Sequence, residues 1–514
     1  MNSSDNKNLI VAIVLMVAVW FGFSIFFPPQ NQPVKPVVKS ESNPIQPRDV
    51  SNTVHDIEKS EKTINVSEQF ISVDDNATLR KIEVDTDLYR AVFTSSGARL
   101  LSFELKKYTS TSDPNSPIVQ LYDDEFLKYS TLRTSGTEGF YISEDLVFSC
   151  DEDQNITLSG DKSKSLVFQT KLASGLQIKK IFTFYGNTYT LDSEIELINS
   201  GSSLIRGTID YALVKRWDSE KDKDRYSFTG PAALVGEKLE EVNVDDLEKS
   251  PVSYGTDALW TSFQTKYFLS VIVPQPESVK RVRILAKGDQ VENIVESPYL
   301  ELASGQKRRL EYLLYIGPKD FDLLKSSGHD LERAVDFGFF GVLSKPLLHT
   351  LVFFYGFLNN YGLAIIILTV IIKLIFWPLT HKSYASMKAM QKLQPEMQKI
   401  RERFKDDKER LNRELMELYK KHRVNPLGGC LPMLVQIPVF FALYKVLLDS
   451  IALRHAPFVW WLTDLSAKDP YYISPLLMGV SMFVQQKMTP TTADPMQARI
   501  FMMMPIIFTI LFLN

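Results

Sequence analysis

Long apolar stretches stand near both ends of this chain, and a polar region lies between them. Residues 9–27 form an uncharged run of 19 residues, which as a helix rises about 28 Å and nearly spans the ~30 Å hydrocarbon core of a bilayer. A cleaved signal peptide is the alternative. Its apolar region would be shorter and would end at a small-residue cleavage site, whereas this run ends in Phe26, Phe27 and two prolines. Residues 1–27 are therefore predicted to form a transmembrane anchor.

The polar region begins with a segment that has too few apolar residues to form a core. Residues 28–77 are rich in Pro, Ser, Asn and Lys, which predicts a flexible linker. Over residues 78–320, short runs of alternating apolar and polar positions recur between turn signals. In one such repeat, residues 177–199, the tripeptide at 185–187 marks a hairpin turn. This pattern predicts a large antiparallel β-sandwich domain.

Apolar helical patterns return after residue 330. Residues 330–358 carry aromatic side chains around much of the helix circumference, which favours a helix lying in the membrane interface. Residues 361–514 are predicted to form a membrane core, with spans at about 361–379, 431–448, 472–487 and 500–514. The last span has only 14 apolar residues, fewer than the ~20 needed to cross a bilayer. We therefore expect that the chain stops inside this span and that a sixth span is missing.

The distribution of charge predicts an orientation. The segment 381–425 contains 13 Lys or Arg and 7 Asp or Glu, whereas the whole chain has a formal charge of −3. Short loops rich in Lys and Arg remain in the cytoplasm. The sequence thus predicts a multi-pass protein of the bacterial inner membrane. Its N-terminus and the 381–425 hairpin would be cytoplasmic, and its β-domain would be periplasmic.

Apolar residues in this basic segment recur every three or four positions, which predicts two amphipathic helices folded on each other. The periodic positions are Met387, Met390, Leu393, Met397, Ile400, Phe404, Leu411, Leu415 and Leu418. Such a hairpin is either a solvated connection or a docking site for a ribosome or targeting factor, because a basic surface attracts RNA and acidic partners. The candidate contact residues are Lys399, Arg401, Arg403, Lys405, Lys408 and Arg410.

The most informative single residue is Lys373, which lies within an uncharged apolar run. A lysine at the centre of a bilayer costs roughly 2.5–3.5 kcal/mol. Snorkelling is the alternative, but Lys373 lies eight residues before His381, about 12 Å along a helix axis. We therefore predict a water-filled cavity within the membrane. Thr369, one turn earlier on the same face, and Gln436, in the next span, are expected to line it.

Several other classes of site find no support in the sequence. Residues 78–320 contain no histidine and no nucleophile motif, and the segment 230–238 has the wrong glycine spacing for a phosphate loop. The two cysteines, Cys150 and Cys430, lie in different environments and do not suggest a disulfide. Lys445 lies near Asp449 and the predicted outer interface. We therefore expect no enzyme, and no catalytic residue, metal or cofactor.

A positively charged, hydrated hollow would lower the cost of carrying polar residues part-way across the membrane, as an inserting polypeptide requires. A solute or lipid transporter is the alternative. It would predict pseudo-symmetric repeats with broken helices, and it would usually place an acidic residue in the spans. A purely structural envelope protein is a third possibility, but it leaves Lys373 unexplained.

Two long motifs in the C-terminal part of the chain resemble those of a known family. They are NPLGGC at residues 425–430, followed by QIP at 436–438, and DLSAKDPYY at 464–472. Over about residues 340–514, the chain closely resembles the YidC/Oxa/Alb family of membrane insertases. The order of anchor, β-domain and spans resembles the Gram-negative branch of that family, whose periplasmic domain resembles a galactose-mutarotase supersandwich.

The resemblance implies a fold and a set of roles. The fold is a polytopic α-helical membrane protein with a large all-β periplasmic domain, a β-supersandwich, and a cytoplasmic helical hairpin. The positive residue of the family's groove falls on Lys373, where many relatives have Arg, and hydrophilic groove positions fall on Thr369 and Gln436. The hairpin falls on the region linked to ribosome and targeting-factor contact. Nascent membrane proteins and the Sec translocon are the other implied partners, and the family's sixth span closes the groove.

Overall fold

The structure is a computed structural model. It describes residues 79–513 except positions 114, 124–126, 145, 153–154, 221, 225–226, 406, 423, 425–430 and 490–494, and it leaves the side chains of Lys408 and residues 495–500 undescribed. The predicted anchor, the predicted linker and Cys430 lie outside the described residues.

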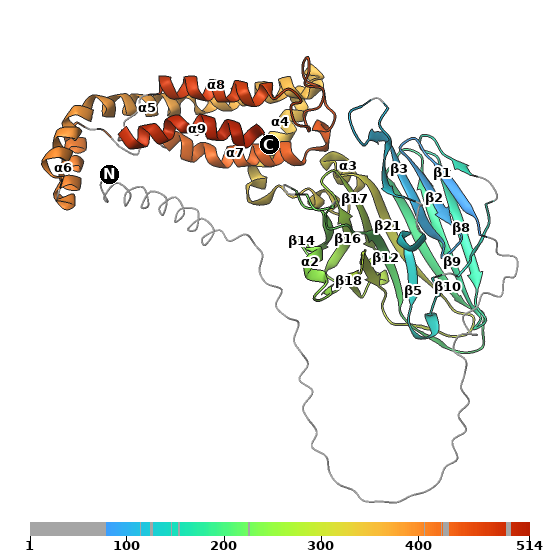
Figure 1. The fold of residues 1–514 in the computed structure, drawn as a ribbon. Helices are drawn as coiled ribbons and strands as arrows, with labels where there is room; N and C mark the ends of the chain where they lie inside the picture. The colour runs from blue at the N-terminus through green and yellow to red at the C-terminus, as the bar shows by residue number, and fades with distance from the viewer. Residues whose placement is uncertain are drawn as a thin grey trace, which may run out of the picture. The chain divides into compact units, whose positions relative to one another are not determined.

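Residues 81–318 form an all-β domain (Figure 1). Its strands are β1 Lys81–Asp85, β2 Tyr89–Thr94, β3 Arg99–Thr109, β4 Ile118–Tyr122, β5 Arg133–Gly136, β6 Ser149–Cys150, β7 Ile156–Thr157, β8 Ser163–Lys171, β9 Leu176–Tyr185, β10 Thr190–Asn199, β11 Ile205–Gly207, β12 Ile209–Arg216, β13 Gly230–Val235, β14 Lys238–Glu241, β15 Val252–Tyr254, β16 Ala258–Gln264, β17 Phe268–Pro274, β18 Arg281–Lys287, β19 Gln290–Glu296, β20 Leu300–Leu302 and β21 Lys307–Pro318.

These strands form one large sheet and three smaller ones. The nine-stranded sheet has the order β14-β13-β16-β17-β21-β10-β9-β8-β6. Two five-stranded sheets have the orders β4-β3-β2-β1-β7 and β15-β18-β19-β12-β5, and β11 pairs with β20. Neighbouring strands are antiparallel except β1 and β7, which are parallel. The sheets share one hydrophobic core, in which Phe93 of β2 packs against Phe182 of β9 at 4.8 Å between ring centroids.

The predicted hairpin at residues 177–199 is present as β9 and β10. Their register pairs Phe184 with Leu191 and Leu176 with Asn199. Burial along β9 alternates strictly between buried and half-buried positions, because successive side chains point to opposite faces of a sheet. One of its buried positions is Lys180, which lies between Ile178 and Phe182 on the core face.

The chain after the β-domain is helical. Its helices are α3 Phe321–Ser327, α4 Gly341–Leu358, α5 Tyr361–Arg403, α6 Lys408–Lys421, α7 Leu431–Asp449, α8 Ile473–Met488 and α9 Pro495–Leu513; α2, Val244–Leu247, lies within the β-domain. Residues before α4 form 3-10 turns at Leu331–Ala334 and Gly338–Phe340. Among the residues that the structure describes, three helices, α4 with the preceding turn, α5 and α7, are long and apolar enough to cross a membrane.

Helix α5 joins two parts that the sequence suggested were separate. The predicted span at 361–379 and the first hairpin helix form one continuous helix of 43 residues, which contains Pro378 and Pro395. A proline inside a helix removes one backbone hydrogen bond, and its ring presses on the preceding turn, but it often bends the helix without ending it. The spanning segment and the hairpin are therefore connected by continuous helical backbone.

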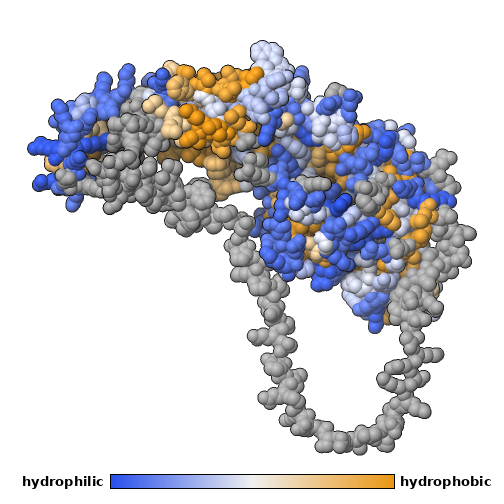
Figure 2. Space-filling model, in the orientation of Figure 1, coloured by the Kyte–Doolittle hydropathy of each residue, from blue (hydrophilic) through white to orange (hydrophobic). Residues whose placement is uncertain are grey.

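The helices pack through a small apolar cluster and leave much of their surface apolar. The cluster joins Leu351 of α4, Ala364 and Leu368 of α5 and Val446 of α7. Figure 2 shows hydrophobic side chains gathered on the outside of these helices, whereas the β-domain surface is mostly polar. Apolar surface of this extent on helices is typical of contact with lipid. The predicted fold class, an α-helical membrane protein with a large all-β domain and a helical hairpin, is confirmed.

Candidate functional site on the membrane helices

Lys373 lies on an exposed face of α5. The buried face of this helix carries Ala364 and Leu368, which pack in the cluster with α4 and α7. Because each helical residue advances by about 100°, Lys373 projects away from that cluster. In the described part of the chain, no hydrogen bond or ion pair reaches its ammonium group. Its charge is thus available to a group that is not part of the described chain.

Thr369 lies on the same face as Lys373, one turn earlier, and it is also exposed. Its hydroxyl donates a 2.8 Å hydrogen bond to the carbonyl oxygen of Ile365. This bond satisfies the hydroxyl proton within the helix and leaves the oxygen free to accept another bond. The structure therefore brings Thr369 and Lys373 together, as their spacing predicts.

Gln436 lies on α7 and is half-buried. In the described residues no hydrogen bond joins it to Lys373 or Thr369. The two helices nevertheless pack against each other; α5 begins at Tyr361 and α7 ends at Asp449. Counting from these ends, Lys373 lies about 18 Å and Gln436 about 20 Å along its helix. The two polar groups therefore stand at a similar depth.

Sequence reasoning missed a third polar group at this level. Gln485 lies on α8, which begins at Ile473, so it is about 18 Å from that end of its helix. Its side chain is exposed. The spacing within the helices could have revealed it, because Gln485 lies as many residues after the start of α8 as Lys373 lies after the start of α5.

Lys445, a lysine of α7, has a partner. Its ammonium nitrogen lies 2.8 Å from a carboxylate oxygen of Asp449, one turn later and at the end of the helix. The expectation that Lys445 lies close to Asp449 is confirmed. This pairing contrasts with Lys373 and explains why Lys445 is the weaker candidate for binding an external group.

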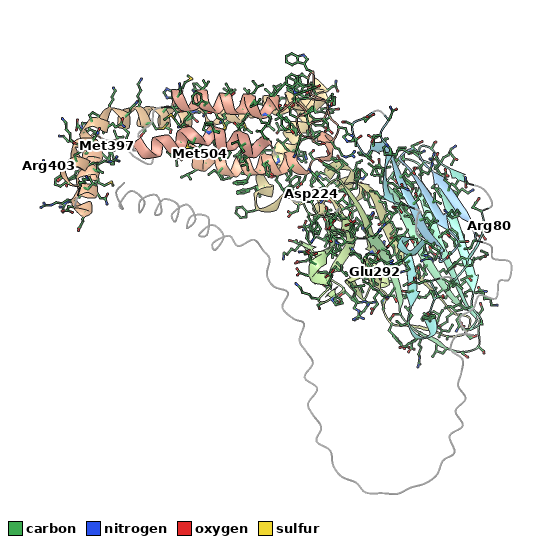
Figure 3. The ribbon with its side chains drawn as sticks, in the orientation of Figure 1. Arg80, Asp224, Glu292, Met397, Arg403 and Met504 are labelled. Carbon is green, nitrogen blue, oxygen red and sulfur yellow. The ribbon has the colours of Figure 1, made fainter. Side chains whose placement is uncertain are left out.

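The hairpin is formed by the second half of α5 and by α6. Its interior contains Met390, Leu393 and Met397 packed on Leu418, as the apolar periodicity predicts. Figure 3 shows Met397 and Arg403 on this hairpin. The candidate contact residues Lys399, Arg403, Lys405 and Arg410 are exposed, Arg401 is half-buried, and the Lys408 side chain lies outside the described residues.

Two of these basic side chains make contacts within the hairpin. Arg410 lies 3.9 Å from Asp407, and the Arg403 guanidinium stands 5.4 Å from the Phe404 ring centroid. Both are exposed interactions of the kind that contribute little to stability. These contacts leave the exposed side chains of Arg403 and Arg410 within reach of an acidic partner.

The β-domain offers a different candidate, a cleft of about 610 Å³ lined in part by Glu292. Figure 3 labels Glu292 within this domain. Several of the cleft's charged side chains pair with one another: Arg283 donates to Asp210 at 2.8 Å, and Arg133 pairs with Glu292. Desolvation raises the pKa of Asp210, although Arg283 partly opposes this. Among the described residues no cluster of His, Cys, Asp or Glu could hold a metal ion. Paired charges give this cleft less capacity for a ligand than Lys373, which has no partner among the described residues.

Comparison with known proteins decides the family. Residues 353–514 match the model described as "60Kd inner membrane protein", and residues 81–350 match "YidC periplasmic domain". "Membrane protein insertase YidC" of Geotalea daltonii is 42% identical over 515 residues, which cover 99% of this chain and 94% of that protein. The chain belongs to the YidC family of membrane protein insertases. The expected family is thereby confirmed.

Two further relatives are similar over almost the whole chain. The proteins of the same name from Geotalea uraniireducens and Geobacter sulfurreducens are 43% and 41% identical, each over 99% of this chain and over 94% and 93% of the relative. These relatives are named as membrane protein insertases, which are not enzymes, in agreement with the expectation that this chain is not an enzyme.

Among solved structures, "Active YidC insertase crystal structure with the first transmembrane domain resolved" has a TM-score of 0.34 and 18% identity over 87% of this chain and 89% of that one. A galactose mutarotase-like protein from Lactobacillus casei has a TM-score of 0.31 and 12% identity over 46% of this chain and 100% of that one. At these scores the likenesses support no conclusion about this chain.

Proposed function

We propose that this protein inserts other membrane proteins into the bilayer and that Lys373 provides the positive charge of the client-binding groove. The observation that carries the proposal is an exposed lysine without a described partner, placed among apolar residues of a membrane helix. Because an uncompensated lysine in hydrocarbon is costly, water and an acidic or polar segment of a client are the expected partners.

The mechanism follows from electrostatics and hydration. Opposite charges attract more strongly in a medium of low dielectric constant than in water, so Lys373 would hold an acidic extracellular segment of a client for a short time. Thr369, one turn from Lys373, and Gln436, at a depth similar to that of Lys373, would exchange hydrogen bonds with the client backbone. The apolar segment of the client would then move into lipid along the exposed helix surface. No step requires nucleotide hydrolysis.

The partners and the orientation belong to the same proposal. The basic hairpin residues Lys399, Arg401, Arg403, Lys405, Lys408 and Arg410 would contact a ribosome or targeting factor in the cytoplasm. The β-domain would lie in the periplasm of a cell with an inner membrane, and the Sec translocon would share some clients. The excess of basic residues in the hairpin supports this orientation.

Site-specific photocrosslinking tests the proposal. A photoreactive amino acid replaces Thr369, and ribosomes translating a small single-span membrane protein supply the nascent client. Ile375 is the matched control position, because it is 68% exposed on α5 but points to a different side of the helix. We expect the client to crosslink at position 369 and to crosslink much less at position 375.

The role of charge is tested in the same assay. Lys373→Ala should weaken the crosslink from position 369, whereas Lys373→Arg should retain it because the charge remains. Lys307→Ala removes an exposed charge of the β-domain and serves as the control. Equal crosslinking at positions 369 and 375, or no effect of Lys373→Ala, would overturn the proposed groove in favour of a transporter.

A further inference from the structure

The loop between α7 and α8 contains a tryptophan that the insertion mechanism does not use. Trp460 is 86% exposed, and its backbone lies in the left-handed region with φ of 51°. A bulky residue rarely adopts this conformation, which costs about 1–3 kcal/mol. The loop therefore accepts backbone strain while presenting a large aromatic ring outside the protein.

The neighbouring ring holds Trp460 in place. Trp460 and Trp461 stack with 5.7 Å between ring centroids and an interplanar angle of 27°. The Trp461 indole N–H donates a 3.1 Å hydrogen bond to Asp469 Oδ1. Asp469 also accepts bonds from the backbone N–H groups of Tyr471 and Ser474, at 3.0 and 2.7 Å, and from the Ser474 hydroxyl at 2.6 Å. Trp461 is thus a fixed platform for the exposed ring.

The same loop is fastened to the beginning of α5. The Asn360 side-chain amide donates a 2.9 Å hydrogen bond to the carbonyl oxygen of Phe458. The Phe458 ring lies so close to Gly362 that a Cβ there would come within 2.1 Å of it. Trp460 therefore has a defined position relative to the helix ends, which a flexible loop would not give it.

The surroundings of this loop indicate what covers Trp460. It joins the end of α7 to the start of α8, and both helices carry exposed apolar side chains, among them Phe440 at 62% and Val480 at 62%. Tyr471 and Tyr472, at the start of α8, are also exposed, at 66% and 48%. The lipid-facing surface of the helices thus continues into an aromatic cluster at their ends. Trp and Tyr are the side chains that concentrate where hydrocarbon meets lipid headgroups, because their rings are apolar and carry one polar group.

We propose that Trp460 inserts into the headgroup and ester region of the bilayer, where it anchors the ends of α7 and α8 opposite the basic hairpin. The ring would lie against acyl chains near the ester groups, and its indole N–H would donate to lipid carbonyl or phosphate oxygens. Such an anchor would fix the depth of the helices, including the level of Lys373, in the membrane. It would be present whether or not Lys373 contacts clients.

Fluorine NMR of the full-length protein in lipid nanodiscs tests the anchor. The chain contains six tryptophans, which are replaced biosynthetically by 5-fluorotryptophan. The signal that disappears in Trp460→Phe belongs to position 460, and Trp460→Tyr provides a second assignment. Lipid bearing a nitroxide at carbon 5 reports contact near the ester region, and a soluble gadolinium chelate reports contact with water. Trp260, fully buried in the β-domain, is the internal control.

The anchor predicts strong broadening of the Trp460 signal by the nitroxide lipid and weak broadening by gadolinium, with little effect of either on Trp260. Broadening by gadolinium alone would place the ring in water and overturn the anchor. Protection from both reagents would show that protein covers the ring, either a partner or a second copy, and would also overturn it. A crosslinking failure at Thr369 would leave this result unchanged, so the two proposals fail separately.

Discussion

Two lysines, one in each part of the molecule, show how differently the parts treat a charge among apolar side chains. Lys180 of β9 is fully buried, and its ammonium donates to the backbone carbonyls of Gly97, Ala98 and Leu132 at 3.2, 2.6 and 2.9 Å. Burial, with a smaller effect of nearby Arg99, holds its pKa well below the usual value. Lys373 is exposed and has no such partner in the described chain.

The two parts differ in the same way in their large apolar side chains. Phe182 in the β-domain is fully buried, whereas Ile375 on α5 is 68% exposed. The β-domain supplies its own apolar core and its own hydrogen-bond partners, so it resembles any water-soluble domain. The helices depend on their surroundings for both: lipid covers the apolar side chains, and, we propose, water and clients bind Lys373. Function is therefore expected where the protein leaves a group unsatisfied.

The largest expected effect is on the core of the β-domain. Trp260→Ala should lower the free energy of unfolding of this domain by about 3–5 kcal/mol, because it removes a fully buried ring and leaves a cavity. Leu259→Ala is the matched control on the same strand, since Leu259 is 42% exposed, and it should change stability by less than about 0.5 kcal/mol. Hydrogen exchange of β16 and β17 amides measures both. Similar losses from the two variants would refute the proposed difference between these two positions of β16.

The next effect concerns the buried lysine. Lys180→Met keeps the length of the side chain but leaves three buried carbonyl groups without their donor, which should cost roughly 2–3 kcal/mol. Lys179→Met, at the half-buried position beside it, should have little effect. Thermal unfolding of the full chain, read from β-domain signals, compares the two. A neutral Lys180→Met would mean that the ammonium is not needed to satisfy these carbonyls.

Packing among the membrane helices gives a smaller effect. A Cβ at Gly479 of α8 would come within 2.1 Å of the Thr509 hydroxyl of α9, so Gly479→Ala should destabilise the helix pair by about 1–2 kcal/mol. Gly356→Ala is the control in α4, where nothing lies within 4 Å of the added Cβ, and it should be neutral or slightly stabilising. Melting in detergent tests both. Combining Gly479→Ala with Thr509→Ala should recover part of the loss, and equal effects of the two glycine variants would argue against close packing of α8 on α9.

The smallest effect is the response of the α7–α8 loop to acid. Burial would raise the pKa of Asp469, but hydrogen bonds from Ser474, Tyr471 and Trp461 outweigh it and lower the pKa to about 2. A lowered carboxyl pKa stabilises the loop above the unfolded-state value of 3.8, and this stabilisation is lost as the pH falls from about 4 towards 2. Hydrogen exchange of the Ser474 backbone amide, corrected for the intrinsic exchange rate at each pH, should become faster as the pH falls through that range. Asp469→Asn should abolish this acid-dependent step, and its persistence in the variant would assign it to another group.

The sequence predicted those features that depend on local periodicity. The alternation in residues 177–199 gives β9 and β10, and the spacing from Met390 to Leu418 gives the hairpin interior. The continuity of α5 was not predicted, because Pro378 lies where the apolar run gives way to polar residues and a helix could equally end there. Lys180 could have been noticed as the one charged residue on the buried face of its strand. Its three carbonyl partners come from distant segments and depend on tertiary structure.

The candidate site was predictable only in part. Lys373 and Thr369 share a face because they are four residues apart on one helix. The similar depth of Gln436 and Gln485 depends on where α7 and α8 begin and end, which apolar composition alone leaves uncertain by several residues. The basic residues of the hairpin are visible in the sequence, but their exposure depends on which face of α5 packs on α6.

The most direct measurement of the central claim is client insertion into proteoliposomes, scored by protease protection, with the charges of protein and client exchanged. A client with an acidic extracellular segment should insert at least about threefold less with Lys373→Glu than with the unmodified protein, since attraction becomes repulsion in a medium of low dielectric constant. A client whose acidic residues are replaced by lysine should insert better with Lys373→Glu than with Lys373. Insertion that depends on neither exchange would contradict a role for the Lys373 charge in handling clients.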